Sequence, residues 1–292
     1  MVLTALLLIL VSTFLHAAWN LLAHTSAESG AFLRRLLISM ILLGAIPAAA
    51  GQILGTPFPA TTWGLLIVAG IFQALYWLGL SMGYRHGEFT VVYPMARAIP
   101  ILLLAVADVI RGREPAPLGW MGIALVSIGS LIVPLSSLRK PTLGHYWNRT
   151  IFWVVVTAMG TVGYTIADKI ALELLPRGPV SAARYVALEF IIGGLFFLPI
   201  WRLFGMRDRG AAPINWHRPV LGAVLAMTAY GLVLWAYQLI DQASYVVAAR
   251  QFSVVVGVVL AAFLLHEPAR VLRLAAALVI MAGIACIILA GG

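Results

Sequence analysis

Charged side chains inside long apolar segments are the first candidates for chemistry in this sequence, because an ionised group in apolar surroundings is costly. Arg97 and Arg250 form the leading pair. Each lies about eight residues into its segment, or about 12 Å along a helix. An arginine at that depth would bind a carboxylate or a phosphate through its planar guanidinium group. The alternative is a structural arginine paired with a helix carbonyl or an acid.

Polar side chains accompany both arginines. Tyr93 precedes Arg97 by four residues, so the two share one face of a helix. Gln251 follows Arg250 directly, and Tyr245 precedes Arg250 by five residues, which places it less well on the same face. We therefore add Tyr93, Gln251 and Tyr245 to the candidate substrate-binding residues.

Two prolines, Pro94 and Pro100, bracket Arg97. They predict a break or bend in this helix, which would expose backbone carbonyls to a ligand, as interrupted helices do in transporters. The segment around Arg250 has no such prolines. We therefore expect the two arginines to be inequivalent in binding.

Three titratable side chains within apolar segments are candidate proton carriers: His16, Asp168 and Glu189. A histidine or a buried carboxylate can titrate near neutral pH when its surroundings perturb it. Structural roles are open as well. Asp168 could neutralise an arginine, His16 could hydrogen-bond within the bundle, and Glu189 could pair with Arg184 or with another helix.

Aromatic and amide side chains in the same segments could line a substrate cavity. Trp19 and Asn20 lie beside His16, and Trp77 and Tyr230 lie well inside their segments. These rings could hold a flat substrate, or a cation by cation–π contact. The alternative is the belt of Trp and Tyr that forms at membrane–water interfaces.

The composition shows which elements must position these residues. Of the 292 residues, 62% are hydrophobic and 10% are charged, with a mean hydropathy of +1.01. Soluble domains carry about 25% charged residues, so a soluble enzyme is excluded. The apolar segments have the length of membrane helices, about 20 residues, and are too long and continuous for barrel strands. They span about 2–22, 31–51, 63–83, 89–110, 117–137, 150–172, 180–203, 218–239, 243–265 and 269–290. The sequence thus predicts an all-α, polytopic membrane protein with ten transmembrane helices.

An internal repeat divides the chain into residues 1–140 and 147–292. A shift of 153 residues superposes identical rare residues, among them Arg97 on Arg250 and Glu114 on Glu267. Each half holds five segments, and five is odd, so the second half must enter the membrane from the opposite side. Two inverted five-helix repeats are an architecture of secondary transporters.

The sequence resembles the drug/metabolite transporter superfamily, specifically its ten-helix EamA-like family. The resemblance rests on the repeat, on HAAWN at 16–20, on an arginine in the second helix of each half, and on the motifs GREP and LHEP that contain Glu114 and Glu267. It implies transport of small metabolites or toxic cations, often as export coupled to protons or to exchange.

The distribution of basic residues predicts how the chain is oriented in the membrane. The net charge is +9, and the predicted helices place twelve Lys and Arg on one side, three on the other and four within helices. The three are Arg111, Arg113 and Arg177. The positive-inside rule places the twelve in the cytoplasm and therefore both termini outside it. This differs from the arrangement that the resemblance implies, with both termini in the cytoplasm. We expect a cell membrane, most simply a bacterial inner membrane.

These observations predict a secondary active transporter that moves a small polar metabolite by alternating access, with an amino acid or organic anion favoured and export as the direction. The first alternative is a proton-coupled exporter of cationic or aromatic drug-like compounds. The second is an intramembrane enzyme or a lipid scramblase. P-loop, GxSxG and HExxH motifs are absent, so we expect neither an ATP-driven pump nor an enzyme. We expect no cofactor, metal or nucleic acid, with protons as a possible coupling ion, in a monomer or homodimer.

Overall fold

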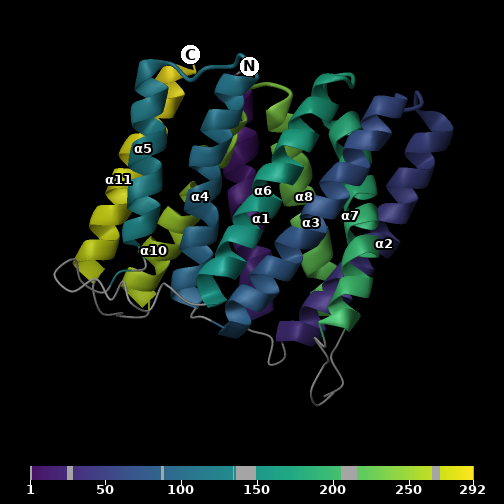
Figure 1. Cartoon of the computed structure of the whole chain (residues 1–292), viewed down its shortest axis with the longest axis horizontal. Helices are drawn as coiled ribbons and strands as arrows, with labels where there is room; N and C mark the ends of the chain where they lie inside the picture. Colours follow the sequence, from purple (N-terminus) through teal and green to yellow (C-terminus); the bar gives the residue numbers. More distant parts are fainter. Residues whose placement is uncertain are drawn as a thin grey trace. The chain divides into compact units, whose positions relative to one another are not determined.

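The computed structural model describes residues 2–24, 29–86, 89–133, 135, 149–204, 216–264 and 270–291. Within these ranges the regular secondary structure is helical (Figure 1). The helices are α1 (Val2–His24), α2 (Ser29–Leu54), α3 (Ala60–His86), α4 (Phe89–Ile110), α5 (Pro117–Ile132), α6 (Arg149–Glu173), α7 (Pro179–Leu203), α8 (His217–Tyr237), α9 (Ala243–Ala249), α10 (Phe252–Leu264) and α11 (Arg270–Ala290). Each of the ten predicted segments is therefore helical, and the ninth is divided into α9 and α10.

Seven helices in the described ranges are long and apolar enough to cross a membrane. Shorter apolar helices occur at Pro117–Ile132 and Ala243–Val259. A helix of about 20 apolar residues satisfies its backbone polar groups internally, which is the requirement for spanning lipid. The protein is therefore a multi-pass membrane protein.

The helices form two compact units, and each unit takes segments from both halves of the sequence. Unit 1 comprises Met1–Leu6, Leu75–Val162 and Leu239–Gly292, and unit 2 comprises Leu7–Ala74 and Gly163–Gln238. The inverted repeat and its boundaries at 1–140 and 147–292 stay predictions.

Unit 1 is built on the close contact between α5 and α11 (Figure 1). A Cβ atom added to Gly122 would lie 2.7 Å from the carbonyl oxygen of Gly283, and one added to Gly283 would lie 2.7 Å from that of Gly122. Small residues let helix backbones approach in this way in a membrane. Helices α4, α9 and α10 pack around this pair.

Unit 2 is built on α2, α7 and α8, which contact one another. Arg184 of α7 lies where α2 ends, against Gly51 and Gly55. Its Nη2 donates to the Thr56 carbonyl at 3.0 Å, and its guanidinium carbon is 4.4 Å from the centre of the Phe58 ring. This arginine therefore holds the C-terminal end of α2, where a positive charge suits the helix dipole.

The predicted break in the fourth helix is wrong, and the alternative, a bend at these prolines, stays a prediction. Helix α4 continues through Pro94 and Pro100, as membrane helices can when neighbouring groups satisfy the freed carbonyls. The interruption lies instead at Arg250 and Gln251, between α9 and α10. The backbone there closes 3₁₀-type bonds, such as Ser253 N to the Arg250 carbonyl at 3.2 Å. That carbonyl also accepts from Ser253 Oγ, and side chains bonded to backbone carbonyls are a known cause of helix distortion.

Candidate functional site

A buried carboxylate in unit 2 is held by two tyrosines from neighbouring helices. Asp168 of α6 accepts a hydrogen bond from Tyr185 Oη of α7 at 3.0 Å and from Tyr230 Oη of α8 at 2.5 Å. Asp168 has no exposed surface, and both tyrosines are buried. We call Asp168, Tyr185, Glu189 and Tyr230 the carboxylate cluster.

Glu189 is the unusual member of the carboxylate cluster. It is fully buried, and both of its carboxylate oxygens lack a hydrogen-bond partner among the described residues. The predicted alternative that it pairs with Arg184 is not supported, because Arg184 bonds to the Thr56 carbonyl. A buried polar group without a partner costs about 1–3 kcal/mol. Such a group in a natural sequence points to a role other than stability.

Helical spacing and aromatic packing position the cluster. Tyr185 and Glu189 are four residues apart on α7, so they share one face, and Tyr164 and Asp168 have the same spacing on α6. The Tyr230 ring packs edge-on against Tyr164 at 5.9 Å between ring centres. Phe190 contacts the same ring at 6.0 Å. Asp168 is thus bonded to a tyrosine whose ring packs against two other aromatic rings.

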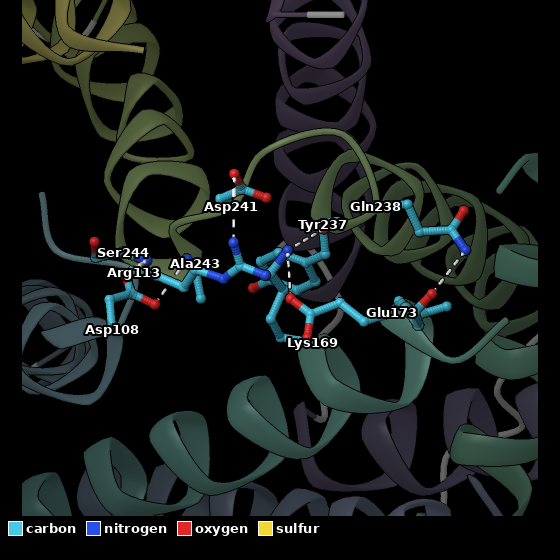
Figure 2. Close-up of polar contacts among 10 residues, drawn as sticks. Asp108, Arg113, Lys169, Glu173, Tyr237, Gln238, Asp241, Ala243 and Ser244 are labelled. Atoms are coloured by element: carbon cyan, nitrogen blue, oxygen red, sulfur yellow. Dashed lines mark hydrogen bonds and ion pairs between the residues drawn. The ribbon is translucent and has the colours of Figure 1, made fainter. Parts of the chain in front are cut away.

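Lys169 follows Asp168 in sequence but binds groups outside the carboxylate cluster (Figure 2). Its Nζ donates to the Tyr237 carbonyl at 2.5 Å and lies 3.2 Å from Glu173 Oε1. The lysine therefore binds the last residue of α8, where a cation complements the exposed carbonyls. The hydrogen bonds of Asp168 come instead from Tyr185 and Tyr230.

Arg97 and Gln251 bind each other reciprocally in unit 1. Arg97 Nε donates to Gln251 Oε1 at 3.1 Å, and Gln251 Nε2 donates to the Arg97 carbonyl at 2.9 Å. Arg97 Nη2 also lies 3.4 Å from the Arg250 carbonyl, at the interruption between α9 and α10. This geometry favours the structural interpretation of Arg97 over an anion site. The Tyr93 side chain lies outside the described residues.

The candidates on α1 satisfy one another locally. Trp19 Nε1 donates to His16 Nδ1 at 3.0 Å, and Asn20 Nδ2 donates to the His16 carbonyl at 2.7 Å. Trp19 is buried, whereas His16 and Asn20 are half-buried. These contacts all lie within one helix. They match the structural alternative for His16, hydrogen bonding within the protein. A role of His16 in proton coupling stays a prediction.

The two remaining aromatic candidates, Trp77 and Tyr245, lie in unit 1. Trp77 is buried and packs edge-on against Tyr76 at 5.7 Å between ring centres. Tyr245 Oη accepts a hydrogen bond from Ala116 N at 3.1 Å, just before α5 begins. Tyr245 also lines a cavity of unit 1.

Sequence reasoning missed Tyr185 and Asp108. Asp108 of α4 is buried and accepts hydrogen bonds from Ala243 N at 3.1 Å and Ser244 N at 2.9 Å (Figure 2). It therefore caps α9 from another helix. The signal for Asp108 was a lone acid near the end of an apolar segment. The signal for Tyr185 was its spacing of four residues from Glu189.

A comparison with known protein families identifies the second half of the chain. Residues 148–289 match the EamA-like transporter family. This match confirms the resemblance found in the sequence and is consistent with the drug/metabolite transporter superfamily.

A solved structure described only as "Crystal structure of protein" shares the fold. It has a TM-score of 0.66 and 16% sequence identity, and the match covers 100% of this chain and 99% of that chain. No curated protein sequence matches the chain. The family is one of transporters, which argues against an enzyme.

Proposed function

We propose that the protein is a proton-coupled secondary transporter of a small polar metabolite, with an amino acid as the favoured substrate. The observation that carries this proposal is Glu189, which is buried without a hydrogen-bond partner in the described part of the chain, beside an aspartate that two tyrosines hold. Two ionised carboxylates in apolar surroundings repel each other and are poorly solvated, so such a pair is suited to hold one proton. Release of that proton would leave a negative charge, which a positively charged group of the substrate could then balance.

The hydrogen bonds suggest different roles for the two acids. Asp168 receives two hydroxyl donors, which stabilise a carboxylate, whereas Glu189 receives none from the residues that the structure describes. Glu189 is then the proton carrier, and Asp168 is the charge that attracts the proton or the ammonium group of a substrate. Because the Arg97 guanidinium is bonded to Gln251, this mechanism does not depend on anion recognition by Arg97.

Alternating access follows from the predicted inverted repeat. Residues 1–140 and 147–292 would be similar five-helix halves of opposite orientation, so the states open to either side would have similar energy. The resemblance to the family favours export, and the bias of basic residues predicts both termini outside the cytoplasm. One chain holds both halves, which suits a monomer.

Flux in proteoliposomes tests the coupling. An imposed pH gradient should drive uptake of one or more labelled amino acids from a mixture. Glu189→Gln and Asp168→Asn should each lower this flux at least tenfold. Glu114→Gln, which removes an exposed loop carboxylate, should not. Wild-type rates in both cluster variants would contradict the proposal.

A second candidate function is export of cationic aromatic compounds. The aromatic rings of Tyr164, Tyr230 and Phe190 around Asp168 favour it, because such rings bind organic cations. The same proteoliposomes distinguish the two functions. If quaternary aromatic amines drive proton movement and amino acids do not, the second candidate replaces the first.

A further inference from the structure

Arg184 of α7 is a buried positive charge that forms no ion pair with an acid among the described residues. It is 7% exposed, and its Nη2 donates to the Thr56 carbonyl at 3.0 Å. Its Nε is buried and has no hydrogen-bond partner within the described ranges. Buried charges in proteins are normally paired, because an uncompensated charge in apolar surroundings is costly. The guanidinium therefore calls for a counter-ion that these residues do not supply.

Two further donors at the same end of unit 2 are buried without a partner in the described part of the chain. They are Gln52 Nε2, in the last turn of α2, and Thr62 Oγ1, in the first turn of α3. Buried polar groups in native proteins nearly always have a partner, and an exception often marks a missing ion. Donors left in this way therefore point to an acceptor from a ligand.

The last turn of α2 and an aromatic ring hold the guanidinium of Arg184 in place. A Cβ atom added to Gly51 would lie 2.5 Å from Arg184 Nε, and one added to Gly55 would lie 2.6 Å from Nη1. The guanidinium carbon is 4.4 Å from the centre of the Phe58 ring. Because the side chain is already confined, binding of an anion would cost little further side-chain entropy.

The nearby helix ends do not neutralise this arginine. Helix α2 ends at Leu54 and carries about half a negative charge there, whereas α3 begins at Ala60 and carries about half a positive charge. Only residues 55–59 separate the two ends, so their contributions largely cancel. The positive charge of Arg184 therefore remains for an anion.

The position of Arg184 along α7 places its side chain at the level of lipid headgroups. Helix α7 begins at Pro179 and has 25 residues, or about 37 Å, against a hydrocarbon core of about 30 Å. Arg184 is about 8 Å from the start of α7, so a centred helix places its Cα about 4 Å inside the core. A long arginine side chain can span that depth. Trp63, whose ring lies 6.4 Å from Phe58, is of a type enriched at the interface.

Apolar side chains around Arg184 are exposed for contact with acyl chains. Ile53 and Leu54 in the last turn of α2 and Val180 in the first turn of α7 are all largely exposed. Val180 precedes Arg184 by four residues, so the two share one face of α7. A ligand that combines an anionic group with acyl chains therefore matches both the buried charge and the apolar surface.

We propose that Arg184 binds the phosphate group of an anionic phospholipid whose acyl chains lie along Ile53, Leu54 and Val180. Guanidinium groups bind phosphate through strong, charge-assisted hydrogen bonds. An anionic lipid is favoured over a zwitterionic one, because the ammonium group of a zwitterionic headgroup already balances its phosphate. The bound lipid ties the last turn of α2 to the first turns of α7. It is a site for membrane lipid and does not rest on the function proposed for the carboxylate cluster.

Native mass spectrometry of the purified full chain, released from an uncharged detergent, tests the site because each bound lipid is resolved by its mass. Dioctanoyl phosphatidylglycerol is the probe, and dioctanoyl phosphatidylcholine is the zwitterionic comparison, which should bind more weakly. Arg184→Gln should weaken binding of phosphatidylglycerol at least about tenfold, as expected for loss of a charge-assisted hydrogen bond. Arg113→Gln removes an exposed arginine of unit 1 and should leave this binding unchanged.

A second variant separates loss of the site from loss of folding. In Gly51→Ala, the atoms nearest to the added Cβ belong to the Arg184 side chain, so the guanidinium must move while its charge is kept. Binding of phosphatidylglycerol should fall about as far as in Arg184→Gln. Gly64→Ala is the matched control, because its Cβ would have no atom within 4 Å, and it should bind the lipid like the wild type.

Wild-type binding of phosphatidylglycerol by Arg184→Gln or by Gly51→Ala would overturn the site. Equal binding of phosphatidylglycerol and phosphatidylcholine by the wild type would do the same. Inorganic phosphate distinguishes a lipid headgroup from a free anion. The proposal predicts that millimolar phosphate leaves the lipid bound; displacement of the lipid would assign Arg184 to a soluble oxyanion instead.

Discussion

Replacing Glu189 with methionine should stabilise the protein and abolish proton-coupled transport. The glutamate is fully buried, and its two oxygens have no hydrogen-bond partner among the described residues. An unpartnered buried polar group costs about 1–3 kcal/mol, and methionine has a similar length without that cost. We therefore expect Glu189→Met to raise the free energy of unfolding by about 1–2 kcal/mol, since a small misfit of the new side chain offsets part of the gain.

Apolar replacement of Asp168, the neighbouring acid, should instead lower the free energy of unfolding. Asp168→Leu removes the acceptor for Tyr185 and Tyr230, which leaves two buried hydroxyls without it. Loss of a buried hydrogen bond costs about 1–3 kcal/mol, so this variant, which loses two, should lose at least about 2 kcal/mol. Two acids in one cluster would thus respond to apolar replacement in opposite directions.

Thermal unfolding in detergent, followed by the loss of monomer in size-exclusion chromatography, measures both effects. Glu189→Gln is the control, because an amide keeps the polarity but cannot carry the proton. It should unfold near the wild-type temperature and be inactive in the flux assay. A Glu189→Met protein that unfolds at a lower temperature than the wild type would refute the reasoning, since it would mean that the carboxyl group makes a stabilising contact.

Three further predictions concern packing, capping and topology. Gly122→Ala should destabilise the protein by about 1–3 kcal/mol, because its Cβ would meet the Gly283 carbonyl at 2.7 Å, whereas Gly64→Ala, with no atom within 4 Å, should be neutral or stabilising. Asp108→Ala should cost about 2 kcal/mol or more because it leaves the first amides of α9 without their acceptor, and chemical unfolding would measure it. A C-terminal alkaline phosphatase fusion should be active and a C-terminal GFP fusion dark, if both termini lie outside the cytoplasm; a bright GFP fusion would reverse this orientation.

The amino-acid sequence determined the class of this protein through composition and periodic spacing. Runs of about 20 apolar residues leave helices as the only way to satisfy the backbone in lipid, so the ten helical segments and their approximate positions follow from local sequence. Where the interruption lies did not follow. The prolines near Arg97 suggested an interruption in α4. The interruption lies instead at Arg250, between α9 and α10, where Ser253 and Arg97 bond to one carbonyl. A proline acts within its own helix, whereas that carbonyl is shared with a side chain 153 residues away.

The residues of the candidate site could be predicted from the sequence, but their contacts could not. Sequence alone identified Asp168, Glu189 and Tyr230, because a charged or aromatic side chain inside an apolar segment is visible without coordinates. Only the tertiary structure decided which groups bond to each other. It placed Tyr185 and Tyr230 on Asp168, directed Arg184 to Thr56 and gave Glu189 no hydrogen-bond partner within the described ranges. Each of these contacts depends on how helices face one another across the bundle, and the spacing of residues along one helix carries no information about that.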